Sequence, residues 1–222
     1  MASVVPCAWK IHSFDDVKRL WFSVRSMPMR TEGREHFHEE RYCVGLYLLA
    51  LGTYRLLGYP FQVEQGESPD FMVTWSSGEV TGLEITRATT QRMQRAMTED
   101  QREYLRREAA AKASGISPEP VSRLLSHGGW IGDEAEKDWC LLFQEIIEKK
   151  LKKLPAFRPA SRHDLVICDD TLLPAVDRRK VVAALRPWVS SLAANAPTLG
   201  TISAIISLDV LFDLGGSAPV LP

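Results

Sequence analysis

Two acidic residues in the first half of the chain stand where they could share a metal ion. Asp70 follows a Ser-Pro pair at the start of an apolar segment, and Glu84 lies inside the next extended segment. Neighbouring strands can bring two such carboxylates together, where each raises the pKa of the other and a cation is needed to balance them. Oxygen ligands favour Mg²⁺ or Mn²⁺, which also bind phosphate oxygens. The pair predicts a divalent metal site.

A third carboxylate can come from the long helix expected before these segments. Glu40 shares a helical stripe with Val44 and Tyr47, so we expect it to face the sheet, whereas Glu39 lies on the stripe of Cys43. We take Glu40 as the accessory ligand, with Glu39 as the open alternative. An acid in the first turn of a helix also has a purely structural interpretation, because it complements the helix dipole.

The structural interpretations of the other candidates are equally simple. A Pro-Asp pair ahead of a strand is a common turn, and a strand carboxylate such as Glu84 can face water. His36 and His38 do not add a zinc site, because side chains two positions apart diverge on a helix and no further ligand follows at a usual spacing.

The elements that must position these residues follow from the spacing of apolar residues. Helical spacing runs from about residue 36 to 57, and Gly58 and Pro60 end that helix. Three extended segments follow, which we predict to form a meander: 61–65, 69–75 and 79–86. Because side chains alternate across a strand, Glu84 and Thr86 share one face of the last segment.

The second half of the chain alternates helices and strands. We predict helices over 90–112, 133–154 and 176–192, and strands over 163–170 and 201–212. The stretch 113–132, rich in Gly and Pro, is expected to be a loop insertion, and 1–34 an N-terminal extension. The whole chain, 1–222, is expected to be a single α/β domain.

The order of these residues resembles the motif of the PD-(D/E)xK nuclease superfamily. Over roughly residues 35–90 a helical acid is followed by G-Y-P-F-Q-V, S-P-D-F, a turn and G-L-E-I-T. The resemblance implies a restriction-endonuclease-like fold, a three-layer α/β core with a mixed central sheet flanked by helices. It also implies a Mg²⁺-dependent or Mn²⁺-dependent nuclease acting on DNA, with Asp70 and Glu84 as metal ligands and Glu40 as the accessory ligand.

The chain departs from that family's pattern at one position. The family places a lysine two residues after the strand acid, where this chain has Thr86, which supplies no positive charge. The stretch I-E-K-K-L-K-K-L resembles a helical pattern of divergent relatives that carry the lysine on a neighbouring helix. Lys150 shares the buried stripe of Ile146, so we predict that Lys150, or else Lys153, positions the attacking water. Thr86 would hold a ligand or water through its hydroxyl.

Other basic residues are candidates for contact with a phosphate backbone. Arg87 is a poorer substitute for the missing lysine, because it lies on the strand face opposite Glu84. We predict nucleic-acid contacts from five further residues: Arg92, Arg95, Lys149, Lys153 and Arg158. Solvated helix faces carry the same residue types, and lysines in a last helical turn complement the dipole.

Composition bounds the class of protein. The chain of 222 residues is 45% hydrophobic and 25% charged, which excludes disordered and collagen-like classes. A net charge of −1 excludes a whole-molecule attraction to nucleic acid or membrane, so any basic surface is local. The four cysteines are dispersed and no apolar run is long enough for a bilayer span. We expect a cytoplasmic protein with no membrane association.

Two other functions are compatible with the same residues. A catalytically inactive relative would keep the fold as a nucleic-acid or protein binding module of a defence or mobile-element system. The absence of the strand lysine, where this chain has Thr86, would be the sign of such a relative. A small α/β interaction protein would carry the acids on its surface. For the nuclease itself, cutting both strands of a duplex requires two sites, which is compatible with a homodimer. Many members of the family carry a separate recognition domain that this chain has no room for, so a partner protein is the expected source of recognition.

Overall fold

The computed structural model describes residues 8–28, 33–88, 134–169, 176–196, 198–207 and 210–214. The predicted helix 90–112 and the predicted loop insertion 113–132 lie outside the described residues, as do Arg92 and Arg95.

Within these described ranges, seven strands form one mixed sheet in the order β1-β2-β3-β4-β5-β6-β7. The strands are β1 (Ala8–Ile11), β2 (Phe61–Gln65), β3 (Phe71–Trp75), β4 (Val80–Arg87), β5 (Arg162–Cys168), β6 (Leu199–Ser207) and β7 (Val210–Asp213). Strands β1 to β4 pair antiparallel, β4, β5 and β6 pair parallel, and β7 returns antiparallel. The predicted α/β class with a mixed central sheet is confirmed.

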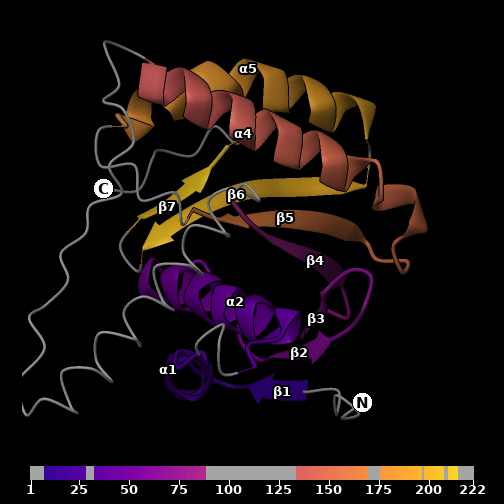
Figure 1. The fold of residues 1–222 in the computed structure, drawn as a ribbon. Helices are drawn as coiled ribbons and strands as arrows, with labels where there is room; N and C mark the ends of the chain where they lie inside the picture. The colour runs from indigo at the N-terminus through magenta and orange to yellow at the C-terminus, as the bar shows by residue number, and fades with distance from the viewer. Residues whose placement is uncertain are drawn as a thin grey trace, which may run out of the picture.

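Helices cover both faces of this sheet (Figure 1). The described helices are α1 (Phe14–Val24), α2 (His36–Thr53), α4 (Glu134–Leu151) and α5 (Arg178–Asn195), and a short 3-10 turn, η2 (Leu154–Ala156), follows α4. Figure 1 shows α4 and α5 side by side on one face and α2 with α1 on the other. The parallel pairs need crossover connections, in which α4 and α5 lie. None of the described helices combines the length and apolar character that a membrane span requires.

The buried side chains form one cluster in each layer. Along β5, Val166 and Cys168 pack with the α1 and α2 cluster, whereas Leu165 and Ile167 pack with the α4 and α5 cluster. A parallel strand covered on both faces is expected to be apolar on both sides. On β4, Leu83 and Ile85 belong to the α1 and α2 cluster. Because side chains alternate, the intervening residue at position 84 points towards α4.

Several predicted boundaries are wrong. Helix α2 ends at Thr53 instead of residue 57, because Arg55 adopts a left-handed backbone with φ of 59° before the chain reaches Gly58. The predicted strand 201–212 is two strands, since β7 turns back to pair antiparallel with β6. The N-terminal segment contributes β1, which pairs with β2, and α1, which packs on α2.

Two glycines of α2 allow α1 to approach it closely. A Cβ atom added at Gly45 would lie 2.6 Å from Cγ2 of Val24, and one added at Gly52 would lie 2.5 Å from the ring of Phe14. Each glycine costs its helix about 1 kcal/mol relative to alanine. The close packing of α1 on α2 explains why small residues stand at these positions.

We expect Gly52→Ala to lower the free energy of unfolding by about 1–3 kcal/mol, because the Phe14 ring must move to admit a methyl group. Gly58→Ala is the matched control, since nothing lies within 4 Å of its added Cβ; we expect a change below about 0.5 kcal/mol. Urea denaturation followed by circular dichroism measures both. Equal effects of the two substitutions would contradict the packing explanation.

Candidate active site

The predicted acids and lysines line one cavity of about 780 Å³ at the end of β4. Its walls come from the first turns of α2, the segment before β3, the end of β4 and the end of α4. Of the residues predicted from sequence, those that line it are Glu40, Asp70, Glu84, Thr86, Lys149, Lys150 and Lys153. The open alternative, Glu39, lines it as well.

The cavity forms where β3 and β4 part. Phe71 opposite Leu83 is the last register pair, so Ile85 has no β3 residue opposite it. The N–H of Ile85 donates instead to Oδ2 of Asp70 at 2.7 Å, and its carbonyl oxygen accepts from Nζ of Lys150 at 3.2 Å. A buried peptide group needs a partner for each polar atom, and here two side chains replace the missing strand.

Lys150 also forms an ion pair with Glu84. Its Nζ donates to Oε1 of Glu84 at 2.6 Å, and the two side chains are 16% and 8% exposed. Lys150 lies in the last turn of α4, beyond a buried stripe formed by Trp139, Phe143 and Ile147. The structure thus brings to Glu84 the lysine that the helical stripe predicted, while Lys153 lines the cavity without this ion pair.

Asp70 carries the strongest electrostatic perturbation of the site. The pKa of its carboxyl group is raised from 3.8 to about 7, chiefly by burial and further by the negative charges of Glu84 and Glu40. The hydrogen bond from Ile85 and the charge of Lys150 oppose this rise in pKa. The negative charges of Asp70 and Glu84 are therefore only partly balanced by nearby positive charge in this buried setting. A bound cation would relieve this imbalance.

Glu40 is held through both of its carboxylate oxygens. Oε1 lies 2.5 Å from Nδ1 of His36, and Oε2 accepts from Nε2 of Gln65 at 3.3 Å. Gln65 is itself fixed, because its Oε1 accepts from Nε of Arg41 at 2.8 Å. Glu40 therefore contributes its charge to the environment of Asp70 from a fixed position.

Glu39 points to a different wall of the cavity. Its Oε1 lies 2.8 Å from Nη1 of Arg87 and 3.7 Å from Nη1 of Arg34. Sequence reasoning set Arg87 aside because it lies on the strand face opposite Glu84. Arg87 and Glu84 nevertheless both line the cavity, because the cavity extends around the edge of β4 that β3 leaves unpaired. Arg34 was not predicted, and its position before α2 carries no sequence signal of a site.

His163 is a further residue beside the site that sequence reasoning missed. It is buried on β5, and its Nδ1 has no hydrogen-bond partner among the described residues. Burial lowers the pKa of its ring, and the charge of Glu84 acts in the opposite direction. Glu84, Lys150 and His163 line a small cavity of about 10 Å³, about the size needed for one water molecule.

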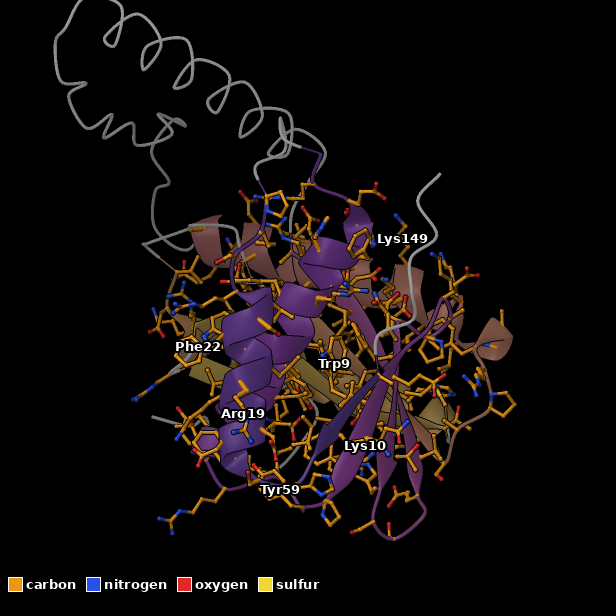
Figure 2. All side chains as sticks on the ribbon, turned by 90° about the horizontal axis from the view of Figure 1, so that it is seen from below. Trp9, Lys10, Arg19, Phe22, Tyr59 and Lys149 are labelled. Carbon is orange, nitrogen blue, oxygen red and sulfur yellow. The ribbon has the colours of Figure 1, made fainter. Side chains whose placement is uncertain are left out.

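Of the remaining predicted residues that the structure describes, Lys149 and Thr86 line the cavity and Arg158 does not. Lys149 is exposed on α4, and Figure 2 shows it well apart from Arg19 on α1. Arg158 does not line the cavity; its side chain is 61% exposed and lies 3.8 Å from Glu64. Thr86 lines the cavity from the same strand face as Glu84.

The donor set fits a magnesium ion held by two carboxylates. Among the described residues, no three His, Cys, Asp or Glu side chains gather closely enough to hold a metal ion. The partners of Glu40, His36 and Gln65, keep that third acid in its own contacts. Mg²⁺ is commonly bound by only one or two carboxylates, and waters and substrate phosphates complete its shell. Asp70 and Glu84 are two carboxylates that line the same cavity.

Comparison with known proteins identifies no similar family, protein or structure. The chain matches no protein-family model, and it matches neither a curated protein nor a solved structure. Its function must therefore be inferred from the chemistry of the cavity.

We expect Asp70→Asn to stabilise the metal-free protein, and more strongly at pH 8 than at pH 5. The pKa of Asp70 is higher in the folded state, so its ionisation destabilises the fold increasingly as pH rises from about 4 to about 7. The gain at pH 8 is at most about 4 kcal/mol, and asparagine still accepts the hydrogen bond from Ile85. Chemical denaturation with a chelator present measures it.

Asp15→Asn is the control for this measurement, because Asp15 is exposed on α1 and lies outside the cavity. An equal gain at both pH values for Asp70→Asn would show that its carboxyl group does not titrate in this range.

Proposed function

We propose that the protein is a Mg²⁺-dependent nuclease that hydrolyses phosphodiester bonds of DNA, with Asp70 and Glu84 as the metal ligands. The observation that carries this proposal is the convergence on one strand segment of two acids and a lysine. Asp70 and Lys150 both bind the backbone of Ile85, and Lys150 also binds Glu84. The cavity volume of about 780 Å³ lies in the range of small-molecule and cofactor sites. DNA is the substrate that the family resemblance implies.

Each side chain has a defined role in this proposal. A divalent ion on Asp70 and Glu84 would activate a bound water and offset charge on the phosphoryl oxygens. The ammonium group of Lys150 orients the attacking water and stabilises negative charge as it develops. Thr86, on the face of Glu84, holds a water or ligand by its hydroxyl, and Glu40 adds negative charge beside Asp70.

The position of Lys150 beside Glu84 supports an active nuclease, because Lys150 can replace the missing strand lysine. A strand lysine two residues after Glu84 would project from the face that Thr86 occupies. Helix α4 covers that same face and delivers the ammonium of Lys150 to within 2.6 Å of Glu84. The positive charge that the family pattern requires is thereby supplied from a second element.

One observation favours an inactive nuclease-like binding module as the second candidate. The ion pair with Lys150 occupies one oxygen of Glu84, and Lys150 could serve as a permanent substitute for the metal. Titration calorimetry with Mn²⁺ separates the two candidates. The nuclease binds Mn²⁺ through Asp70 and Glu84, whereas the inactive module binds nucleic acid or protein without binding Mn²⁺.

The nuclease is tested by Glu84→Gln and Asp70→Asn. We expect each substitution to reduce Mg²⁺-dependent cleavage of plasmid and single-stranded DNA by at least about 10²-fold, because the metal loses an anionic ligand. Glu148→Gln, an exposed acid on the same helix as Lys150, should leave the rate unchanged. Cleavage that survives either of the first two substitutions contradicts the proposal.

Lys150→Met should separate catalysis from metal binding. We expect cleavage to fall by about 10²-fold or more, since no other described side chain donates to Glu84. Mn²⁺ affinity should rise, because the competing ammonium is gone. Lys152→Met, exposed and absent from the cavity lining, should alter neither quantity. A fall in Mn²⁺ affinity would show that Lys150 supports the fold of the site instead of the reaction.

A further inference from the structure

We propose that the ring of Phe157 is a stacking surface for an unpaired base of the substrate, which makes single-stranded DNA the substrate class of the candidate site. This inference deepens the proposed function and rests on it for the identity of the ligand. It starts from an aromatic residue that lines the same cavity as Asp70, Glu84 and Lys150 and that the proposed reaction does not use.

Phe157 lies next to Glu84 and Lys150. These three residues line the cavity of about 780 Å³ together, and together they also line the small cavity of about 10 Å³. The ring of Phe157 meets the buried ring of His163 edge to face, with 5.5 Å between the ring centroids. His163 pairs with Gly82 in the register of β5 and β4, so it lies on the sheet face of Glu84. The ring of Phe157 is therefore placed over the sheet face that carries a proposed metal ligand.

Backbone hydrogen bonds fix Phe157 at this position. Its N–H donates to the carbonyl oxygen of Leu154 at 3.1 Å, where the 3-10 turn η2 ends. The N–H of the next residue, Arg158, donates at 2.9 Å to the carbonyl oxygen of Ser68, two residues before Asp70. The segment that carries Phe157 is thus tied to the segment that carries Asp70. Such preorganisation lowers the entropic cost of binding a ligand.

Phe157 supplies an apolar surface in a cavity that is mainly polar. The described apolar residues of the lining are Cys43, Ile85, Ile146 and Phe157, and the other lining residues are polar or charged. Cys43 and Ile85 are only 1% and 2% exposed, whereas Phe157 and Ile146 are half-buried. Binding sites typically combine an apolar or aromatic surface with a few polar groups that orient the ligand. The cavity therefore suits a ligand that has both an apolar face and a charged group.

A nucleotide of a single strand has both features. Proteins that bind single strands combine aromatic side chains, on which bases stack, with basic residues that follow the phosphates. Two exposed lysines, Lys149 and Lys153, line the same cavity as Phe157. In a duplex each base is already stacked between its neighbours, so only an unpaired nucleotide can offer a face to the ring. A base on Phe157 would hold its neighbouring phosphate near the metal proposed at Asp70 and Glu84.

A purely structural role of Phe157 makes a different prediction. If the ring serves only to cover His163, replacing it changes the binding of every nucleic acid through the fold, or changes none. If the ring stacks on a base, the loss requires a base that is free to stack. The dependence on the base therefore separates the two roles.

Binding is measured by fluorescence anisotropy on the full chain with a chelator present, so that no cleavage occurs. The probes are a short single-stranded oligonucleotide, a strand of the same length in which every nucleotide is abasic, and a blunt duplex of the same sequence. We expect Phe157→Leu to weaken binding of the first probe about fivefold or more, the loss typical of one stacked base, and to leave the other two affinities unchanged. Phe157→Trp keeps an aromatic face and should bind the single strand at least as tightly as the wild type does.

Phe22→Leu is the matched control, because Phe22 is an exposed phenylalanine of α1 that does not line the cavity. Figure 2 shows it well apart from Lys149, which does. It should change none of the three affinities. Urea unfolding of Phe157→Leu reports any effect on the fold, and the abasic strand and the duplex show whether such an effect reaches binding.

The inference is overturned if the wild type binds no single strand, if Phe157→Leu leaves that affinity unchanged, or if the abasic strand or the duplex loses as much. Its failure is distinguishable from failure of the proposed function, because binding is measured without metal. A wild-type chain that never cleaves DNA, yet loses base-dependent binding with Phe157→Leu, removes the nuclease and leaves the stacking surface. Mg²⁺-dependent cleavage by a chain whose binding does not depend on Phe157 does the reverse.

Discussion

The backbone of Ile85 is the point on which the site depends. Beyond Leu83 strand β4 loses β3 as its neighbour on one side, so a buried peptide group that faces that side must find other partners. Leaving such a group unsatisfied costs about 1–3 kcal/mol. Asp70 accepts from its N–H and Lys150 donates to its carbonyl oxygen, and these same two contacts hold the carboxylate and the ammonium beside Glu84. One structural requirement of the fold therefore assembles the candidate site.

Charge is distributed unevenly around the cavity as a result. On one wall Asp70, Glu84 and Glu40 face a single ammonium, and the pKa of Asp70 stays raised because Lys150 compensates only part of the negative charge. On the other wall two guanidinium groups share one carboxylate. The proposed function assigns the divalent ion to the acid wall, beside the ammonium group of Lys150.

The parts of this arrangement that could be predicted from sequence are those governed by local periodicity. Strand alternation places Glu84 towards α4, and helical spacing selects Lys150 from four neighbouring lysines. The point where β3 leaves β4, and hence the grouping of Arg87 with Glu84, depends on pairing between distant segments. The same holds for His163, which approaches Glu84 only because β5 pairs with β4. Local pattern also failed where backbone conformation decided the outcome, as at Arg55.

Supplying the lysine from a helix makes the site depend on the packing of that helix. A strand lysine would be fixed by the backbone that carries Glu84, whereas the ammonium of Lys150 is placed by the way α4 lies on the sheet. Trp139 sets that placement, because its indole N–H donates to Oδ2 of Asp169 at 2.9 Å and its ring stacks on Phe143 with centroids 3.6 Å apart. Since interiors are close-packed, a change in these core contacts would shift the last turn of α4 and the distance from Lys150 to Glu84 with it. The core beneath α4 therefore acts as a determinant of the geometry of the site, in addition to the residues that line the cavity.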